Sequence, residues 1–153
     1  MSVLDIRKAG DPVLKKAARS VPKITKTVRN LLDNMVETMK EADGVGLAAP
    51  QVGVSLRVIV IDVGGGLIEL INPDIIESEG CETSVEGCLS VPGMYGEVER
   101  FTCVTVKGIN RNNESVIVKG DGLLARALQH EIDHLEGVLF IERAQSIFRE
   151  RKE

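Results

Sequence analysis

Both histidines of the chain lie in one short segment, "ALQHEIDHLEGVLF", at residues 127–140. His130 and His134 are four residues apart, and Glu131 directly follows the first of them. On an α-helix, residues four apart are offset by about 40° around the axis, so both imidazoles leave one face and could bind one metal ion. Glu131 points about 100° away from His130, where a carboxylate can reach a water held by that metal. The spacing indicates metal-assisted hydrolysis; the alternative is an amphipathic helix with two polar residues on its edge.

A catalytic metal needs another protein ligand, because two histidines alone leave too many coordination positions open. No histidine follows His134, and the downstream carboxylates of Glu136 and Glu142 are candidates. Upstream, "SVEGCLSVPG" at residues 84–93 offers Cys88 in a tight backbone setting, where a thiolate and neighbouring amides could converge. The residues themselves favour Cys88 as the third ligand and leave a buried, non-ligating thiol as the alternative.

The chain has three cysteines, an odd number, and its first residues, "MSVLDIRKAGDP", lack the apolar run of a secretion signal. We therefore expect reduced thiols and a cytoplasmic location rather than a disulfide framework. Cys103 lies in an alternating, strand-like pattern and is predicted to belong to the core. Cys81 lies in a polar stretch and is predicted to have no part in the site.

A third segment, "GVGLAAPQVG" at residues 44–53, consists of small residues that let the backbone approach another group closely. Within it, Gln51 is the one side chain that can both donate and accept hydrogen bonds. Taken alone, the segment is more typical of a Gly/Ala loop that leaves a helix. The glycine triplet at residues 64–66 lacks the following helix and lysine of a phosphate-binding loop, so it is predicted to form a turn.

The composition is that of an ordinary globular protein, with 43% hydrophobic and 27% charged residues. A chain of 153 residues is expected to form a single domain, residues 1–153, with a substantial core. The net charge of −4 argues against nucleic-acid specificity. No stretch of about 18 apolar residues occurs, so no membrane span is expected.

Helices are predicted in the first part of the chain. Asp11 and Pro12 predict a short helix that ends near Ala18. A longer helix is predicted to be capped by Thr25 and to end at Gly44. Its core-facing stripe consists of Val28, Leu31, Leu32, Met35, Val36 and Met39.

The middle of the chain is rich in β-branched residues and predicts two hairpins. Their strands are residues 56–62 with 67–73, and residues 96–109 with 114–120. A final helix would begin at Asp121 and end at Gly137, and the tail "RAQSIFRERKE" would form a short polar helix or fray. We therefore expect an α+β fold, with antiparallel or mixed sheets packed around a central C-terminal helix that carries the His-Glu-x-x-His motif.

Together, the segments "GVGLAAPQ", "EGCLS" and "QHEIDHLEG" resemble, in order and in type, the three signature motifs of peptide deformylases. The motifs are highly specific as a set, and the resemblance spans nearly the whole chain. It implies a metallohydrolase that removes the N-formyl group from the initiator N-formylmethionine of nascent polypeptides and releases formate. In the family, one divalent ion is bound by the residues that correspond here to Cys88, His130 and His134. That ion is usually Fe(II), and zinc, nickel or cobalt can replace it.

The resemblance also implies which residues perform the reaction. Water activated by the metal attacks the formyl carbonyl, and Glu131 acts as the general base and then as the general acid. The side-chain amide of Gln51 and the backbone N–H of Leu89 would stabilise the developing oxyanion. A thiolate ligand on Fe(II) is prone to oxidation, so activity should be lost in air and be better retained with nickel.

By the same resemblance, an apolar pocket holds the methionine side chain of the substrate. The residues implied in substrate binding are Gly44, Val45, Gly46, Leu123 and Ala127, together with the ring of His130. Backbone groups of Gly46 and of residues 93–95 are expected to pair with the peptide as an added strand. Core packing is the alternative for Leu123.

Several charged residues are expected to support this site. Glu86 and Arg100 are predicted to pair and to fix the cysteine segment, and two surface charges are the alternative. Some family members have an apolar residue in place of Arg126 and a charged one in place of Tyr95, so the roles of both stay open. Asp133 could orient a ligand or neighbouring backbone, or face solvent.

The partners implied by the resemblance are N-formylmethionyl nascent peptides and, transiently, the ribosome. In some members a longer basic C-terminal extension helps ribosome association. Here the basic residues near the end are Arg143, Arg149, Arg151 and Lys152. This composition is more typical of a solvated tail.

Overall fold

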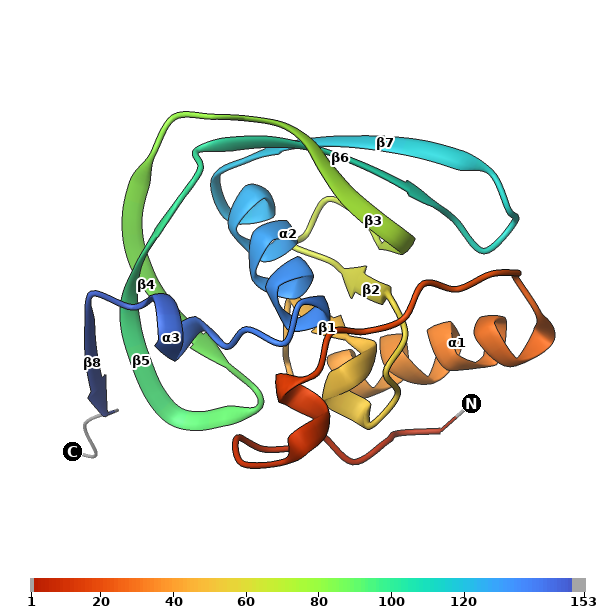
Figure 1. The fold of residues 1–153 in the computed structure, drawn as a ribbon, viewed down its shortest axis with the longest axis horizontal. Helices are drawn as coiled ribbons and strands as arrows, with labels where there is room; N and C mark the ends of the chain where they lie inside the picture. Colours follow the sequence, from red (N-terminus) through yellow and green to blue (C-terminus); the bar gives the residue numbers. More distant parts are fainter. Residues whose placement is uncertain (1, 150–153) are drawn as a thin grey trace.

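The chain folds into two antiparallel sheets around an enclosed helix, α2, in a computed structural model that describes residues 2–149 (Figure 1). The α-helices are α1 (Lys26–Glu41), α2 (Gly122–Leu135) and α3 (Phe140–Arg143), and the 3-10 helices are η1 (Pro12–Lys15) and η2 (Ala49–Val52). The strands are β1 (Gly46–Ala48), β2 (Val58–Ile61), β3 (Ile68–Glu79), β4 (Glu82–Cys88), β5 (Val91–Arg100), β6 (Cys103–Ile109), β7 (Ser115–Asp121) and β8 (Ser146–Arg149). The five-stranded sheet has the order β1-β2-β3-β6-β7, and the three-stranded sheet has the order β4-β5-β8. The predicted α+β class is confirmed.

Helix α2 lies at the centre of the molecule, with β6 and β7 passing over it and the β4–β5 hairpin curving around another side (Figure 1). Its buried face includes Ala125, Leu128 and Leu135, which share one core cluster with Ile59 and Val106 of the large sheet. Because close-packed interiors leave little free space, strands on several sides hold this helix in one setting. The side chains that α2 carries therefore start from a rigid support.

Helix α1 forms where the apolar stripe predicts it, and the stripe faces the core. The side chain of Thr25 caps it by accepting a hydrogen bond from the Val28 N–H at 3.3 Å. The predicted end at Gly44 is wrong, because Asp43 adopts the left-handed conformation, with a φ of 54°. Gly44 serves another purpose, since a Cβ there would lie 2.9 Å from Leu89 Cδ1. Neither α1 nor any other helix within residues 2–149 is long and apolar enough to cross a membrane.

The predicted hairpins are partly correct. The β2–β3 and β6–β7 pairs are antiparallel hairpins, and residues 64–66 lie in the connection of the first. Residues 96–109 do not form one strand, because the chain bends at residues 101–102 and sends β5 and β6 into different sheets. Strand β4 was not predicted: Glu86 is its one buried residue, so it lacks the apolar alternation that indicates a strand.

Both ends of the chain also differ from the prediction. The helix expected after Asp11 is one short 3-10 turn, because the Ala18 N–H donates to Leu135 O at 2.8 Å and the chain turns onto α2 instead. The tail forms neither a polar helix nor a frayed end over the residues that can be described. It forms β8, which pairs with β5 at the edge of the small sheet. The remainder of the predicted tail, residues 150–153, lies outside the described residues.

Candidate metal centre

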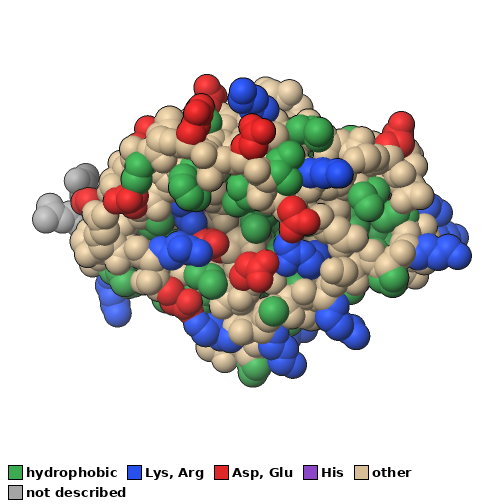
Figure 2. Space-filling view, turned by 45° about the horizontal axis from the view of Figure 1, so that its top comes forward, with side chains coloured by type: hydrophobic (Ala, Val, Ile, Leu, Met, Phe, Trp, Pro, Cys, Tyr) green, Lys and Arg blue, Asp and Glu red, His purple; other side chains and the backbone are tan. Residues whose placement is uncertain are grey.

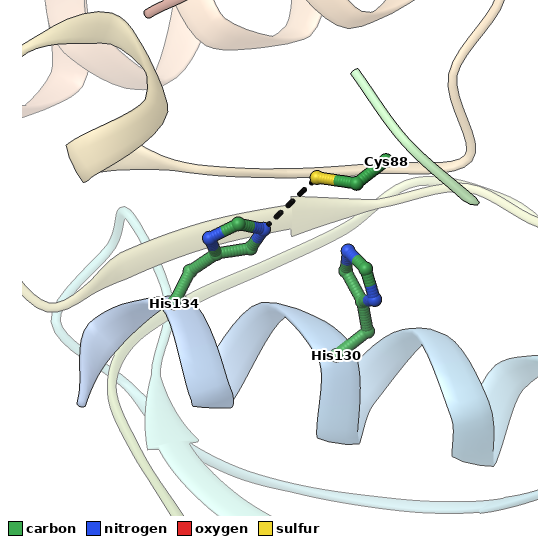
Figure 3. Close-up of side chains that lie close together, drawn as sticks. All are labelled: Cys88, His130 and His134. Atoms are coloured by element: carbon green, nitrogen blue, oxygen red, sulfur yellow. Dashed lines mark hydrogen bonds between the residues drawn. The ribbon is translucent and has the colours of Figure 1, made fainter. Parts of the chain in front are cut away.

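Cys88, His130 and His134 converge where the end of β4 faces the C-terminal half of α2 (Figure 3). One ligand atom from each residue lies within 4.8 Å of the others, and Cys88 Sγ is 3.3 Å from His134 Nε2. A tetrahedral metal with bonds of about 2.0–2.3 Å separates its ligand atoms by about 3.3–3.8 Å. The three donors can therefore close around one ion with small adjustments. One thiolate and two imidazoles suit iron, zinc, nickel or cobalt.

The two imidazoles are prepared for metal binding in different ways. His130 Nδ1 lies 3.0 Å from Glu86 Oε1, which leaves Nε2 free for an ion. Burial lowers the pKa of His134 well below its usual value, so this ring is neutral, as a ligand must be. Burial also lowers the pKa of His130, but the charge of Glu131 and the hydrogen bonds with Cys88 and Glu86 raise it well above its usual value. Negative charge that holds a proton so firmly also favours a metal cation.

Glu131 follows the first histidine and places its carboxylate against the backbone of Gly46. The side chain is buried, and burial raises the pKa of Glu131 to about 7. Its Oε1 is buried and has no hydrogen-bond partner within residues 2–149. A Cβ on Gly46 would lie 2.6 Å from Oε2, so glycine leaves the room that this acid occupies. A carboxyl group with a pKa near neutrality is suited to accept and return a proton.

Gln51, in η2, directs its side-chain amide toward the cysteine segment. Oε1 accepts a hydrogen bond from the Ala48 N–H at 3.0 Å, and this fixes the orientation of the amide. Nε2 donates to Ser90 Oγ at 3.1 Å and lies 3.6 Å from Cys88 Sγ. Leu89 connects those two residues in the turn that leads to β5. The sequence did not single out Ser90, although this fully buried residue belongs to the quoted "EGCLS" segment.

A cavity of about 450 Å³ opens beside these groups. Its lining includes every residue that the resemblance implies in substrate binding: Gly44, Val45, Gly46, Leu123 and Ala127. The lining also includes Gln51, Cys88, Leu89, His130 and Glu131. Leu123 is 56% exposed, so the alternative of core packing is wrong. Tyr95 and Arg126, whose roles the sequence leaves open, line the same cavity.

A buried network of charges lies behind the metal ligands. Arg100 and Glu86 pair as predicted, through hydrogen bonds of 2.8 and 2.9 Å. Their side chains are 3% and 8% exposed, so the alternative of two surface charges is wrong. Burial raises the pKa of Glu86, but hydrogen bonds from Arg100 and His130 lower it to about 2. Asp133 accepts a hydrogen bond of 2.6 Å from Arg100 and another from Arg143, which settles its orientation.

The expectation that the backbone of residues 93–95 pairs with a peptide is wrong at Tyr95. Strand β1 begins at Gly46 and, within residues 2–149, pairs with β2 alone, which leaves its other edge free there. Tyr95, by contrast, pairs with Gly87 of β4 on one side and with Phe148 of β8 on the other. The backbone of Tyr95 is therefore inside a sheet and cannot take an added strand. Among the strands that the structure describes, the edge strand on this side is β4, whose residues 85–88 line the cavity.

Comparison with known proteins finds related sequences and structures. The profile of the polypeptide deformylase family matches residues 3–150. The peptide deformylase of Halothermothrix orenii is 60% identical over 152 residues, which cover 98% of this chain and 99% of the relative. That of Carboxydothermus hydrogenoformans is 58% identical over 149 residues, which cover 97% and 98%. The crystal structure of the Synechococcus elongatus peptide deformylase in complex with actinonin matches with a TM-score of 0.91 and 45% identity, over 94% of this chain and 79% of that one. The chain belongs to the polypeptide deformylase family, whose members remove the N-formyl group from nascent peptides.

Proposed function

We propose that this chain removes the N-formyl group from the initiator N-formylmethionine of nascent polypeptides, with one divalent ion bound by Cys88, His130 and His134. The observation that carries the proposal is the approach of these three ligand atoms to within 4.8 Å, beside the buried carboxylate of Glu131. Family membership supports the substrate and the release of formate. Cys88 and His130 of this ligand cluster line the cavity together with Glu131, and this supports hydrolysis of a substrate bound in the cavity.

The donor set fits Fe(II), which we assign as the physiological ion, with zinc, nickel or cobalt as replacements. When bound, such an ion acts as a Lewis acid and lowers the pKa of a coordinated water. Three protein ligands leave one position open, as catalytic sites require. Glu86 holds His130 from behind, and this contact determines which ring nitrogen faces the site.

Glu131, Gln51 and Leu89 are the groups that we assign to the reaction itself. Glu131 accepts a proton from the attacking water and delivers it to the leaving amine, a task that its raised pKa of about 7 favours. Gln51 Nε2 and the backbone N–H of Leu89 donate to the oxyanion that develops on the formyl oxygen. Because Ala48 and Ser90 already hold the Gln51 amide, this donor is oriented before the charge forms.

The cavity is the proposed site of the substrate methionine. Val45, Leu123 and Ala127 give it apolar walls. Val45 and Leu123 are 42% and 56% exposed, so a bound side chain would cover apolar surface that now faces water. The peptide backbone would continue as an added strand between the free edges of β1, near Gly44 and Gly46, and β4.

The proposal also covers the domain organisation of the chain, its location in the cell and its lack of nucleic-acid specificity. Residues 1–153 form one catalytic domain, which is supported by a family match over residues 3–150. A cytoplasmic location is supported by three cysteines that are all free. We propose no nucleic-acid specificity, because the net charge is −4, and on the face shown in Figure 2 acidic and basic side chains lie close together.

Transient ribosome association would bring the enzyme to nascent chains. Arg143, one of the basic residues near the end of the chain, is already paired with Asp133. The last basic residues of the tail lie outside the described residues. Ribosome co-sedimentation of the whole chain, compared with a chain that lacks residues 150–153, tests whether the tail contributes; equal co-sedimentation would exclude it.

Formate release tests the proposed reaction. The metal-loaded chain should release formate from an N-formylmethionyl peptide and leave an N-acetylmethionyl control peptide intact. Internal peptide bonds should survive. Cleavage of an internal bond without formate would instead favour a zinc peptidase, the main rival for a His-Glu-x-x-His motif.

Replacement of Glu131 tests the assigned proton transfer. Glu131→Gln keeps the shape of the side chain and removes the proton acceptor. The variant should bind the metal with unchanged stoichiometry and release formate at least about 100-fold more slowly. An unchanged rate would remove Glu131 from the mechanism.

A further inference from the structure

We propose that Arg126 is a positioning residue that holds Glu86, and through it the imidazole of His130, in the setting that the metal centre requires. The inference rests on the proposed metal centre. It assigns a role to a residue that the family resemblance leaves open, and it follows from the contacts of one side chain.

Arg126 is 7% exposed and reaches from α2 to both strands of the β4–β5 hairpin. Its Nη1 donates to Glu86 Oε2 at 2.8 Å and to Val98 O at 3.1 Å. Its Nη2 donates to Glu82 O at 2.8 Å and to Val98 O at 3.1 Å. One guanidinium therefore connects the helix that carries two metal ligands to the hairpin that carries the third.

Glu86 is held by four hydrogen bonds, one of which comes from Arg126. Oε1 accepts from Arg100 Nη2 at 2.8 Å and contacts His130 Nδ1 at 3.0 Å. Oε2 accepts from Arg100 Nε at 2.9 Å and from Arg126 Nη1 at 2.8 Å. A carboxylate has about four lone-pair sites, so all of them are occupied. Arg126 completes this set, and Glu86 has no unoccupied acceptor that would let it turn toward another donor.

The four-residue spacing of Arg126 and His130 lets both side chains contact the carboxylate of Glu86. The two residues are one turn apart on α2, so they share a face, and both end on the same carboxylate. Two contacts from successive turns of this rigid helix hold the Glu86 carboxylate, and with it the imidazole of His130, more firmly than one contact would. A turn of the imidazole away from Glu86 would displace its Nε2 atom, the nitrogen that faces the proposed metal. Metal–ligand distances tolerate about 0.2 Å, so even a small rotation would weaken the site.

Loss of Arg126 should disturb the orientation of Glu86 and His130 more than the stability of the fold. Arg100 would still neutralise Glu86 through its own two hydrogen bonds. Lysine could not take over fully, because one ammonium cannot reach all the acceptors that a planar guanidinium reaches. Removing the guanidinium also leaves the carbonyls of Glu82 and Val98 without this donor, so a control with a similar structural cost is needed.

Gln129 provides that control. Its Nε2 donates to Phe101 O at 2.9 Å, and its Oε1 accepts from the Phe101 N–H at 2.9 Å. This side chain ties the same helix to the chain between β5 and β6, and none of its hydrogen bonds involves Glu86. Gln129→Met should therefore cost stability without loosening the support of His130.

The experiment compares the wild type with Arg126→Met, Arg126→Lys and Gln129→Met, each loaded with Co(II). Thermal unfolding of the metal-free proteins measures the structural cost, and transfer of Co(II) to a chelator, followed by its visible absorption, measures the site. Arg126→Met should release Co(II) about tenfold faster or more, with shifted absorption bands, and Arg126→Lys should lie between it and the wild type. Gln129→Met should lower the unfolding midpoint and release Co(II) as the wild type does.

Two outcomes would overturn the inference in different ways. If Arg126→Met and Gln129→Met release Co(II) at the same rate, Arg126 has only a structural role. If the wild type binds no Co(II), the proposed metal centre fails and the inference fails with it. Should Arg126→Met not fold, Arg126→Lys carries the same comparison, because it keeps the charge and most of the volume.

Discussion

The Cα of Gly46 lies against the carboxylate of Glu131, where a Cβ would come within 2.6 Å of Oε2. Gly46→Ala should therefore displace the carboxylate by about 1 Å and lower the rate of formate release about 100-fold, because catalytic groups tolerate little misplacement. Metal content, measured by elemental analysis, should not change. Gly65→Ala is the control, because a Cβ there has no neighbour within 4 Å. Wild-type rates from Gly46→Ala would contradict the proposed position of the acid.

Glu86 should make the metal-free protein sensitive to acid. The pKa of Glu86 is lowered from 4.5 to about 2 in the folded chain. Burial raises this pKa, but the hydrogen bonds from Arg100 and His130 lower it by more. A carboxyl group with a depressed folded-state pKa stabilises the fold above its unfolded pKa, and this contribution is lost as pH falls toward the folded value. Urea unfolding should show a large wild-type advantage over Glu86→Gln at pH 7 that narrows below pH 4.5. A constant difference across that range would refute the assignment.

For single residues, the sequence predicts the side chains that bind the metal and transfer the proton better than it predicts the side chains that hold them in place. The spacing of His130, Glu131 and His134 indicates a metal and an acid because helix geometry relates spacing to direction. The pairing of Glu86 with Arg100 was also predicted, against the alternative of two surface charges, and the structure confirms it. The hydrogen bonds of Arg126 and Ser90 could not be predicted, because they depend on how the β4–β5 hairpin packs against α2 and against η2, respectively.

Among the elements, β3 is tied to the N-terminal part of the chain by one side chain. Asn72 accepts from the Val21 N–H at 2.8 Å and donates to Val21 O at 2.9 Å. Asn72 also has a left-handed φ of 53°. Asn72→Gly loses the hydrogen bonds alone, whereas Asn72→Ala loses them and adds strain of about 1–2 kcal/mol.

Chemical denaturation should therefore rank the free energy of unfolding as wild type, then Asn72→Gly, then Asn72→Ala. The two lost hydrogen bonds account for about 2 kcal/mol of the first step. Because alanine restricts the unfolded chain more than glycine, the second step should be about 1 kcal/mol. If both variants are equally stable, the strain of the left-handed conformation is no larger than the gain from restricting the unfolded chain, and the expected ranking is wrong.

Elements with a one-sided apolar pattern were predicted, including the helix α2 that carries both histidines, whereas the strands β1 and β4 that border the site were not. Helix α1 and the β2–β3 and β6–β7 hairpins carry periodic apolar residues, so local sequence is sufficient for them. Strand β4 is exposed on most of its length and turns Glu86 inward, toward polar partners instead of a hydrophobic core. Strand β8 depends on pairing with β5, a contact that its own residues do not indicate.

In the molecule as a whole, the candidate site lies where the two sheets meet across α2. Strand β1 of the large sheet brings Gly46, strand β4 of the small sheet brings Cys88, and α2 brings both histidines. No local pattern relates these segments. The need for a third ligand favoured Cys88 beside the two histidines, and the family resemblance added the segment that contains Gly46. A metal ion bound there would connect the small sheet to the central helix.

This connection predicts that metal stabilises the entire fold. A ligand that binds only the folded state raises the free energy of unfolding by about 4 kcal/mol when its concentration is 1,000 times its dissociation constant. Excess Co(II) should therefore raise the unfolding midpoint of the metal-free wild type. Cys88→Ser should lose most of this increment, because a hydroxyl is a poor ligand for such ions. Cys81→Ser should retain it, since the exposed Cys81 thiol contacts Glu99 and lies outside the ligand cluster. An equal increment in Cys88→Ser and the wild type would show that the thiolate does not hold the metal, whatever the two histidines do.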